Sequence, residues 1–248
     1  GGAGSCCVCT GCAGERRRRV GCLEVAGSLA RFGLSRCGRG CRFCAVKGGA
    51  PIQVEPDEAD EVAIAASELG LSHVVVTSVT RDDIHDGGAS HFASVIRTIR
   101  DTLPNTTVEV LTPDFQGDSS AISAVIEAGP HVFNHNVETV PSLYADVRPN
   151  ADYERSLAVL SIAAELADEQ NADIKIKSGL MVGFGETDKE VMEVMDDLKS
   201  AGCGIITIGQ YLQPSRGHHP VEKFYRPEEY QNFEERGKEL GLTVFAGP

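Results

Sequence analysis

From Glu55 to the end of the chain, apolar runs rich in β-branched residues alternate with longer stretches of helical periodicity. Alternation of this kind predicts βα units around a parallel sheet, because the helix that joins two parallel strands covers one face of that sheet. Six such units, with a further strand before Cys37, predict an α/β fold built as an open or partial (β/α) barrel. Prolines at expected helix starts and glycines after expected helix ends punctuate the pattern: Pro56, Pro227, Gly70, Gly202 and Gly241.

The same periodicity sets the expected boundaries. Helices are expected at residues 56–69, 88–102, 118–129, 153–169, 187–201 and 227–240. Strands are expected at residues 72–77, 107–111, 131–134, 173–181, 204–209 and 242–245. No linker interrupts residues 50–248, so residues 31–248 are interpreted as one domain that follows an N-terminal segment of different character.

Polar residues follow five successive strands of this predicted barrel. In (β/α) barrels the functional residues gather at the carboxyl ends of the strands, so these segments predict one shared site. The segments are 77–83, 112–114, 134–138, 179–186 and 210–216. Structural interpretations stay open for single members, with Asn134 and Asn136 as helix caps, His135 as a buried histidine, and Asp82 and Asp83 as first-turn carboxylates.

Cys37, Cys41 and Cys44 form a C-x3-C-x2-C run that fits on a tight loop. Three thiolates at this spacing suit three irons of a [4Fe-4S] cubane, which leaves the fourth iron without a protein ligand. An open iron can bind and activate a small molecule, whereas a fully ligated cluster mostly transfers electrons. Zinc fits less well, since structural zinc sites need four ligands and no fourth ligand lies near Cys44 in the sequence.

The composition limits the classes of partner and compartment. The 248 residues include 23 basic and 36 acidic side chains, and the formal net charge of -13 argues against a nucleic-acid or anionic-membrane surface. No apolar run approaches the roughly 18 residues that span a bilayer, and no secretory signal is visible. The clustering of the nine cysteines favours metal binding in a reducing cytoplasm over a disulfide scaffold.

Residues 1–30 show no helical or strand period. They are rich in glycine and arginine and contain five cysteines, Cys6, Cys7, Cys9, Cys12 and Cys22. Two interpretations stay open: a second metal site, or a disordered or mistranslated end. The first residue is Gly rather than Met, which favours a fragment.

Longer motifs carry a resemblance to a known family. They are CRFCAVKGGAP, VVVTSVTRDDIHDGGASHF, VFNHNVETVPSLY with VRPNADYERSL, KSGLMVGFGET, and GQYLQPSRGHHPVEKF. From Cys37 to Pro248 the chain resembles the lipoyl synthases, which are radical S-adenosylmethionine (SAM) enzymes. The resemblance implies a sulfurtransferase (EC 2.8.1.8) in which a 5′-deoxyadenosyl radical takes hydrogen from C6 and C8 of a protein-bound octanoyl-lysine, and sulfur enters at each carbon.

The resemblance also implies roles for single residues. Cys37, Cys41 and Cys44 would hold the [4Fe-4S] cluster whose free iron chelates SAM. The residues implied to bind SAM are Phe43, Thr77, Ser78, Asn134, Asn136, Glu138, Gly179, Met181, Gly183, Glu186, Gln210, Tyr211 and Leu212. Contacts with the substrate or its peptide are implied for Arg81, His85 and Arg216.

Family members are expected to hold a second, auxiliary [4Fe-4S] cluster that supplies the sulfur, through an upstream C-x4-C-x5-C pattern and a serine of a C-terminal RSSY segment. Here Cys7 and Cys12 keep part of that spacing, but Arg18 stands at the third position. Gly38 stands where the family usually has Thr, and the chain ends before the RSSY segment. These departures predict a fragment with a degenerate auxiliary region and reduced activity.

The resemblance implies partners as well. They are octanoylated lipoyl carrier domains, on the acyltransferase subunit of 2-oxoacid dehydrogenases and on the glycine-cleavage H protein, and an electron donor such as flavodoxin or ferredoxin. The implied location is the cytoplasm or an organellar matrix. Two alternatives stay open: a radical SAM enzyme that cleaves SAM without donating sulfur, and a non-enzymatic cysteine–metal protein.

Overall fold

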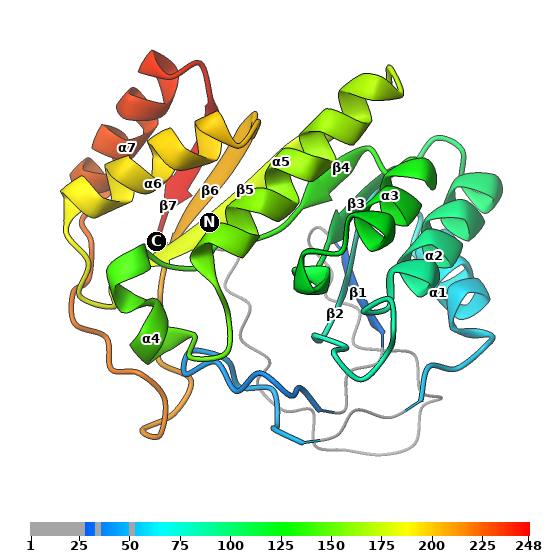
Figure 1. The fold of residues 1–248 in the computed structure, drawn as a ribbon, viewed down its shortest axis with the longest axis horizontal. Coiled ribbons are helices and arrows are strands. Elements are labelled where there is room, and N and C mark those ends of the chain that lie inside the picture. Colours follow the sequence, from blue (N-terminus) through cyan, green and yellow to red (C-terminus); the bar gives the residue numbers. More distant parts are fainter. Residues whose placement is uncertain (1–27, 33–35, 50–52) are drawn as a thin grey trace.

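The computed structural model describes residues 28–32, 36–49 and 53–248. Seven strands form one sheet in chain order, and each neighbouring pair is parallel. The strands are β1 (Ser28–Phe32), β2 (His73–Ser78), β3 (Thr107–Leu111), β4 (Val132–Asn134), β5 (Lys175–Val182), β6 (Ile205–Gln210) and β7 (Thr243–Gly247). In this described sheet β1 and β7 form the two edges, so the predicted partial barrel is confirmed (Figure 1).

Helices follow the strands as the periodicity predicts. They are α1 (Glu58–Glu68), α2 (Ala89–Thr102), α3 (Ser119–Glu127), α5 (Tyr153–Glu169), α6 (Asp188–Ser200) and α7 (Pro227–Glu239). All six expected helices are confirmed, although Pro56 lies just before α1 rather than in its first turn. The sequence pattern missed α4 (Tyr144–Val147) and the 3-10 turns η1 (Phe115–Gly117) and η2 (Pro141–Leu143), because elements this short show no period.

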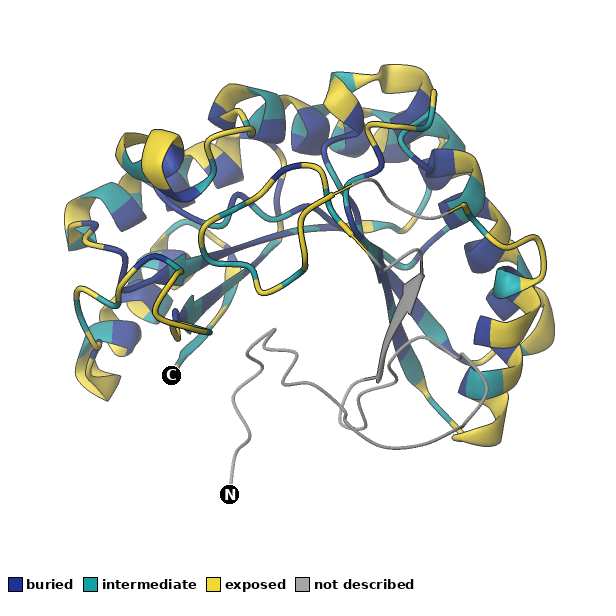
Figure 2. Cartoon of the chain, turned by 90° about the horizontal axis from the view of Figure 1, so that it is seen from below, coloured by how far each residue is buried: buried dark blue, intermediate teal, exposed yellow. Residues whose placement is uncertain are grey.

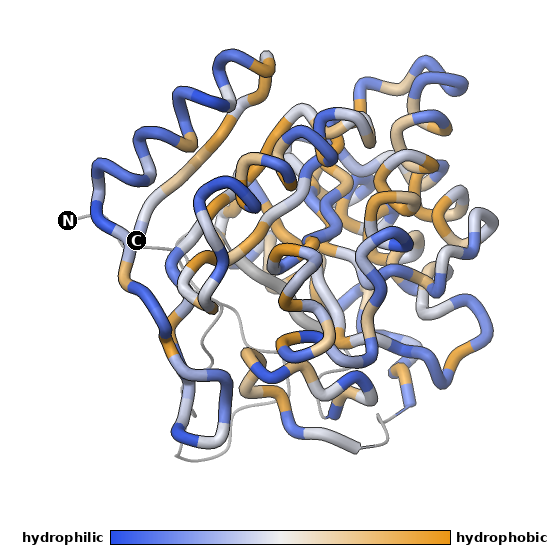
Figure 3. Tube along the Cα trace, turned by 60° about the vertical axis from the view of Figure 1, so that its left-hand side comes forward, coloured by the Kyte–Doolittle hydropathy of each residue, from blue (hydrophilic) through white to orange (hydrophobic). Residues whose placement is uncertain are grey.

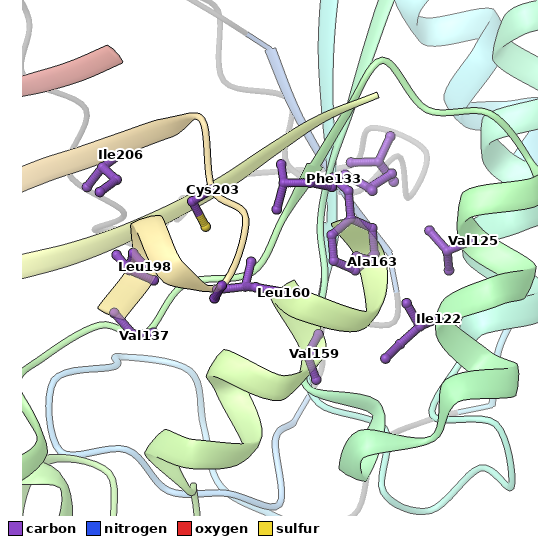
Figure 4. Packing of buried hydrophobic residues seen from close by; sticks show 14 of the residues in the cluster. Ile122, Val125, Phe133, Val137, Val159, Leu160, Ala163, Leu198, Cys203 and Ile206 are labelled. Atoms are coloured by element: carbon purple, nitrogen blue, oxygen red, sulfur yellow. The ribbon is translucent and has the colours of Figure 1, made fainter. Parts of the chain in front are cut away.

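The main core lies between the convex face of the sheet and the helices. Figure 2 shows the buried sides of the helices turned toward the curved sheet and their exposed sides turned outward. Figure 4 shows Phe133, Leu160 and Ile122 packed in this layer, and all three are fully buried. Cys203 packs there with the apolar side chains, so its interpretation as a small apolar filler is confirmed.

The helix α7 is too hydrophilic to be assigned to the barrel from its composition alone. In α7, beside the C-terminus, hydrophilic residues dominate (Figure 3), and only Tyr230, Phe233 and Gly237 are buried. The packing of α7 against β7 therefore depends on these three buried residues alone. Among the described residues, no helix is both long and apolar enough to cross a membrane.

Side chains alternate between the two faces of the sheet along each strand, and polar side chains lie on the concave face. In β3, Val108 and Val110 join the core, so Glu109 between them faces the other side of the sheet. Lys177 donates to Glu109 at 2.8 Å, and the amide of Asn134 donates to it at 3.1 Å. Burial raises the pKa of Glu109, but hydrogen bonds and the charge of Lys177 outweigh this and lower it. A charged, hydrogen-bonded layer thus lies on the concave face, below the carboxyl ends of the strands. These strand ends, with the loops that follow them, are called the mouth of the barrel below.

Candidate active site

The cysteine loop, residues 36–49, lies across the carboxyl ends of the strands. Arg39 forms ion pairs with carboxylates that follow β2 and β3. Phe43 contacts Phe184, which follows β5, with ring centroids 6.3 Å apart. The loop with the candidate cluster ligands is therefore held at the end of the barrel where the polar strand ends gather.

A small apolar cluster, separate from the main core, holds the second half of this loop. It consists of Val147, Phe184 and Tyr211, with Phe43 packed against it. The rings of Phe184 and Tyr211 stack at 4.2 Å, and the hydroxyl of Tyr211 donates to the carbonyl of His219 at 2.8 Å. The N–H of His219 donates to the backbone carbonyl just before Phe43, so the GHHP segment also packs on the loop.

Cys37, Cys41 and Cys44 are half-buried free thiols. Burial raises the pKa of Cys41, against the charge of Arg148, and it raises the pKa of Cys44 to about 11. Since iron binds thiolates, cluster assembly has to release these protons. Within the described ranges, no three His, Cys, Asp or Glu side chains meet at a single-ion site. A cubane remains compatible with this arrangement, because each cysteine binds an iron of its own.

Unpartnered polar atoms gather in the segment after β4. Six buried side-chain atoms of the described residues have no hydrogen bond, and five of these lie between residues 134 and 148. They are Asn134 Oδ1, His135 Nε2, Asn136 Oδ1, Thr139 Oγ1, Arg148 Nε and, outside this segment, Ser178 Oγ. Native proteins rarely leave buried polar atoms unpaired, so this segment is suited to a polar ligand.

The structure decides between the interpretations left open for these residues. Asn134 ends β4 and no helix follows it directly, so the helix-cap interpretation is wrong for Asn134 and Asn136. His135 is a buried histidine, with Nδ1 at 2.9 Å from the carbonyl of Thr112, and burial lowers its pKa to about 4. The first-turn interpretation of Asp82 and Asp83 is wrong, because α2 begins at residue 89.

Glu138 joins the segment after β4 to β5. Its backbone has a left-handed φ of 67°. Its N–H donates to the carbonyl of Gly179 at 3.0 Å, and its carbonyl accepts from Met181 at 2.9 Å. Burial raises the pKa of its carboxyl group. A Cβ at Gly179 would lie 2.5 Å from Thr207 Oγ1 and 2.9 Å from Asn136 Oδ1, so only glycine fits there.

The glycine-rich turn after β5 is closed by its own carboxylate. Glu186 accepts the N–H groups of Gly183 at 2.6 Å and of Phe184 at 2.9 Å. Gly183 has a φ of 113°, and a Cβ there would lie 2.3 Å from Gln210 Nε2 and 2.7 Å from the carbonyl of Lys223. Gln210 donates to three backbone carbonyls and accepts one N–H group. These side chains fix the backbone path at the mouth.

Comparison with known proteins shows the family to which the chain belongs. The radical SAM superfamily matches residues 34–198. A lipoyl synthase from Caldanaerobacter subterraneus subsp. tengcongensis is 54% identical over 232 residues, which cover 93% of this chain and 78% of that relative. A lipoyl synthase from Caldicellulosiruptor saccharolyticus is 52% identical over 213 residues, covering 86% and 73%. The chain belongs to the lipoyl synthase family.

Solved structures share the fold at much lower identity. Methylornithine synthase has a TM-score of 0.63 at 13% identity, covering 88% of this chain and 70% of that one. Streptococcus suis SuiB bound to S-adenosylmethionine has a TM-score of 0.68 at 10% identity, covering 89% and 50%. At such identities the likeness shows the fold alone, and it agrees with the partial barrel of a lipoyl synthase.

Membership of the lipoyl synthase family establishes the reaction class. The protein is a radical SAM sulfurtransferase whose cofactors are [4Fe-4S] clusters and SAM, and whose substrate is a protein that carries octanoyl groups. The predicted fold, reaction and cofactors are thereby confirmed. The mouth fits these groups, since it combines three half-buried thiols with unpartnered polar atoms on the neighbouring segment.

Several residues predicted to bind SAM are engaged in bonds of the fold. The hydroxyl of Thr77 donates to the carbonyl of Leu111 at 2.9 Å, and that of Ser78 donates to Val79 at 2.9 Å. Leu212, by contrast, is 46% exposed. In this lipoyl synthase, ligand contacts from Thr77 and Ser78 would therefore come from the atoms that these bonds leave open.

The predicted substrate residues are placed in different surroundings. Arg81 is buried and forms two hydrogen bonds of 2.9 Å with Asp83, whereas His85 and Arg216 are exposed. Cys7 and Cys12, the predicted auxiliary ligands, lie outside the described residues.

Sequence reasoning missed Arg148 in the family motif VRPNADYERSL. Its Nη1 donates to the carbonyl of Val137 and to the hydroxyl of Tyr144, both at 3.0 Å. Its charge also acts on Cys41 and Glu138. The local sequence contains no signal for this role, because the preceding run YADV mixes buried and exposed residues.

Acid is expected to weaken the ion pair that joins Asp114 to Arg39. Burial raises the pKa of Asp114, but hydrogen bonds and charge from Arg39 outweigh this and lower it to about 2. Because the folded pKa lies below the unfolded one, the pair stabilises the fold fully above about pH 4 and loses its contribution, of order 2 kcal/mol, as the pH falls toward 2. Urea unfolding between pH 7 and pH 2.5 should show a shallower acid loss for Asp114→Asn than for the unchanged protein. Parallel curves would contradict the assignment.

Proposed function

We propose that Cys37, Cys41 and Cys44 hold the cluster that binds and cleaves SAM in this lipoyl synthase. The observation that carries the proposal is the position of three half-buried free thiols on a loop held across the carboxyl ends of the strands. When bound, the cluster supplies the electron that converts SAM to methionine and a 5′-deoxyadenosyl radical. The chain itself would position the cluster and SAM and exclude water from them.

The residues around the mouth divide this work. Asn134 and Asn136 offer carbonyl oxygens without partners to the polar groups of SAM, and Glu138 lies beside them on the same segment. The turn from Gly179 to Glu186 is proposed to lie against the adenine ring. Gly179 and Gly183 let this backbone pack closely on its protein neighbours, which fixes the shape of the turn. The remaining mouth residues, which form the pocket wall, are Phe43, Thr77, Ser78, Met181, Glu186, Gln210, Tyr211 and Leu212.

The substrate is proposed to enter over the open side of the mouth. His85 and Arg216 are exposed, and they are proposed to contact the peptide that carries the octanoyl-lysine. Arg81 is buried against Asp83, so its proposed role is to shape the β2–α2 loop that presents His85. Proposed carriers are lipoyl domains of 2-oxoacid dehydrogenase acyltransferases and the glycine-cleavage H protein.

An electron donor of the flavodoxin or ferredoxin class is proposed to reduce the cluster. A reducing compartment, the cytoplasm or an organellar matrix, is proposed because thiolate-bound clusters need reduced cysteines. Residues 31–248 are proposed as the catalytic domain, and its described helices and strands share one main core. Residues 1–30 are proposed as a separate segment in which Cys7 and Cys12 form at most part of an auxiliary site.

Iron and acid-labile sulfide per chain, measured after anaerobic reconstitution, test these assignments. About eight of each would mean two cubanes, and sulfur insertion into an octanoylated carrier peptide is then expected. About four of each would mean that only the SAM cluster forms, and SAM cleavage without lipoyl product is then expected. Values near zero would refute the cluster assignment. The SAM-cleavage product 5′-deoxyadenosine and the lipoyl peptide are measured in the same reaction.

A further inference from the structure

Arg39 lies inside the C-x3-C spacer, between Cys37 and Cys41. Its guanidinium donates five hydrogen bonds. They reach Asp82 at 2.7 and 2.9 Å, Asp114 at 2.9 and 2.8 Å, and the carbonyl of Asn150 at 3.1 Å. Arg39 is 7% exposed and Asp114 is 4% exposed, so most of this network is shielded from water.

The partners of Arg39 come from three separate parts of the barrel. Asp82 follows β2, Asp114 follows β3, and Asn150 lies just before α5. The contact with Asn150 is reciprocal, because its side-chain amide donates to the backbone carbonyl of Arg39 at 2.8 Å. Arg155, from α5, is a second cation on Asp114 at 3.4 Å, so the two carboxylates face two arginines. The two positive charges of Arg39 and Arg155 balance the two negative charges of Asp82 and Asp114. We therefore expect Arg39 to act on the loop mainly through the geometry of its hydrogen bonds.

The rest of the spacer makes no side-chain contact of its own, since Arg39 is flanked by glycines. A Cβ at Gly38 or Gly40 would have no described atom within 4 Å. Gly40 has a φ of 63° and needs glycine, whereas Gly38 has no such constraint. Glycine has more backbone freedom than any other residue, so the spacer depends on Arg39 to adopt one conformation.

We propose that Arg39 is a positioning residue that fixes the spacer between Cys37 and Cys41, so that both thiols are preset for the cluster. This inference rests on the proposed assignment of the cysteines as cluster ligands. Phe43 and the apolar cluster hold the loop on the far side of Cys41. Backbone hydrogen bonds to Lys47 and Gly49 hold Cys37 itself, so Arg39 is the side-chain anchor of the spacer between the two cysteines.

Two substitutions separate the geometry of Arg39 from its charge. Arg39→Lys keeps the charge but cannot form the planar fork, and Arg39→Gln removes both. The readout is the rate at which a ferrous chelator takes iron from the anaerobically reconstituted holoenzyme, with the reduction potential of the cluster measured alongside. We expect both variants to lose iron about 10–100-fold faster, the scale by which metal affinity falls when a residue that supports metal ligands is replaced. The reduction potential should stay close to that of the unchanged protein in Arg39→Lys.

A control is Arg236→Lys, which makes the same substitution in a more exposed ion pair with Asp196, at 2.7 Å, away from the cysteine loop. It should leave iron release unchanged. Adding Gly38→Ala to Arg39→Lys should slow iron release again, because the Cβ enters open space and restricts the spacer. A merely structural role of Arg39 would not give this rescue.

The outcomes are distinguishable. Iron release at the rate of the unchanged protein, or the same increase in Arg236→Lys, would overturn the positioning role. So would a fast release in Arg39→Gln alone, with a shifted potential and no rescue, because that pattern means a charge effect. If Arg39→Gln fails to fold, Asp82→Asn removes one half-exposed arm of the network and should still raise the release rate. Full iron binding by Cys41→Ala would instead refute the ligand assignment beneath the inference.

Discussion

Replacing Cys41 by alanine is expected to leave the protein without the SAM cluster and without detectable SAM cleavage. Two thiolates remain on the loop, and they cannot hold three irons of a cubane. The variant should therefore show about four fewer irons and sulfides per chain than the unchanged protein after the same anaerobic reconstitution. The SAM-dependent change in the EPR spectrum of the reduced cluster should vanish with them, and the brown absorbance should fall by the share of that cluster.

The control for this variant is Cys203→Ala. Cys203 is 2% exposed and packs in the main core, and the raised pKa of its thiol reflects that burial. Its replacement removes little more than one sulfur atom and should leave iron content and SAM cleavage intact. If Cys203→Ala lost the cluster as well, the loss in Cys41→Ala would report damage to the fold rather than a missing ligand.

Gly183→Ala is expected to have the largest effect of any single methyl group added at the mouth. The new Cβ would meet Gln210 Nε2 at 2.3 Å and the backbone carbonyl of Lys223 at 2.7 Å, in a backbone region that is strained for a residue other than glycine. Strain and overpacking together should lower the free energy of unfolding by about 2–4 kcal/mol. SAM affinity should also fall, because the turn closed by Glu186 moves. Urea unfolding and equilibrium binding of SAM measure the two effects.

Gly204→Ala is the matched control, because no described atom lies within 4 Å of its Cβ position and its φ is not positive. Its free energy of unfolding should stay within about 0.5 kcal/mol of the unchanged protein. Equal losses at the two positions would contradict the assignment of the effect to crowding at Gly183.

The sequence was sufficient for the barrel because local patterns and the fold agree. The expected helix 153–169 coincides with α5, and the expected strand 107–111 coincides with β3. Long amphipathic helices and buried parallel strands have strong periods, so their existence and order follow from the spacing of apolar residues. The order of the strands then follows from right-handed βα connections between neighbours.

The site was only partly accessible to the same reasoning. The C-x3-C-x2-C spacing and the polar strand ends located the mouth, because both are local in the chain. The role of Glu186 was not accessible, since the sequence predicted contact with SAM, while its carboxylate closes the glycine-rich turn. Whether it also contacts SAM stays a prediction. Arg148 was missed because its partners depend on how the segment after β4 folds back.

By itself, therefore, the sequence determined the βα alternation, the three-cysteine loop and the family. Each of these follows from the identity and spacing of residues that are close together in the chain. Only the tertiary structure decided what holds the loop in place. Arg39 meets Asp114 across 75 positions of sequence, and Asp82 across 43, and no local period encodes such a contact. The physical reason is burial: the ion pairs form only where the folded barrel brings the ends of β2 and β3 to the cysteine loop and shields Arg39 and Asp114 from water.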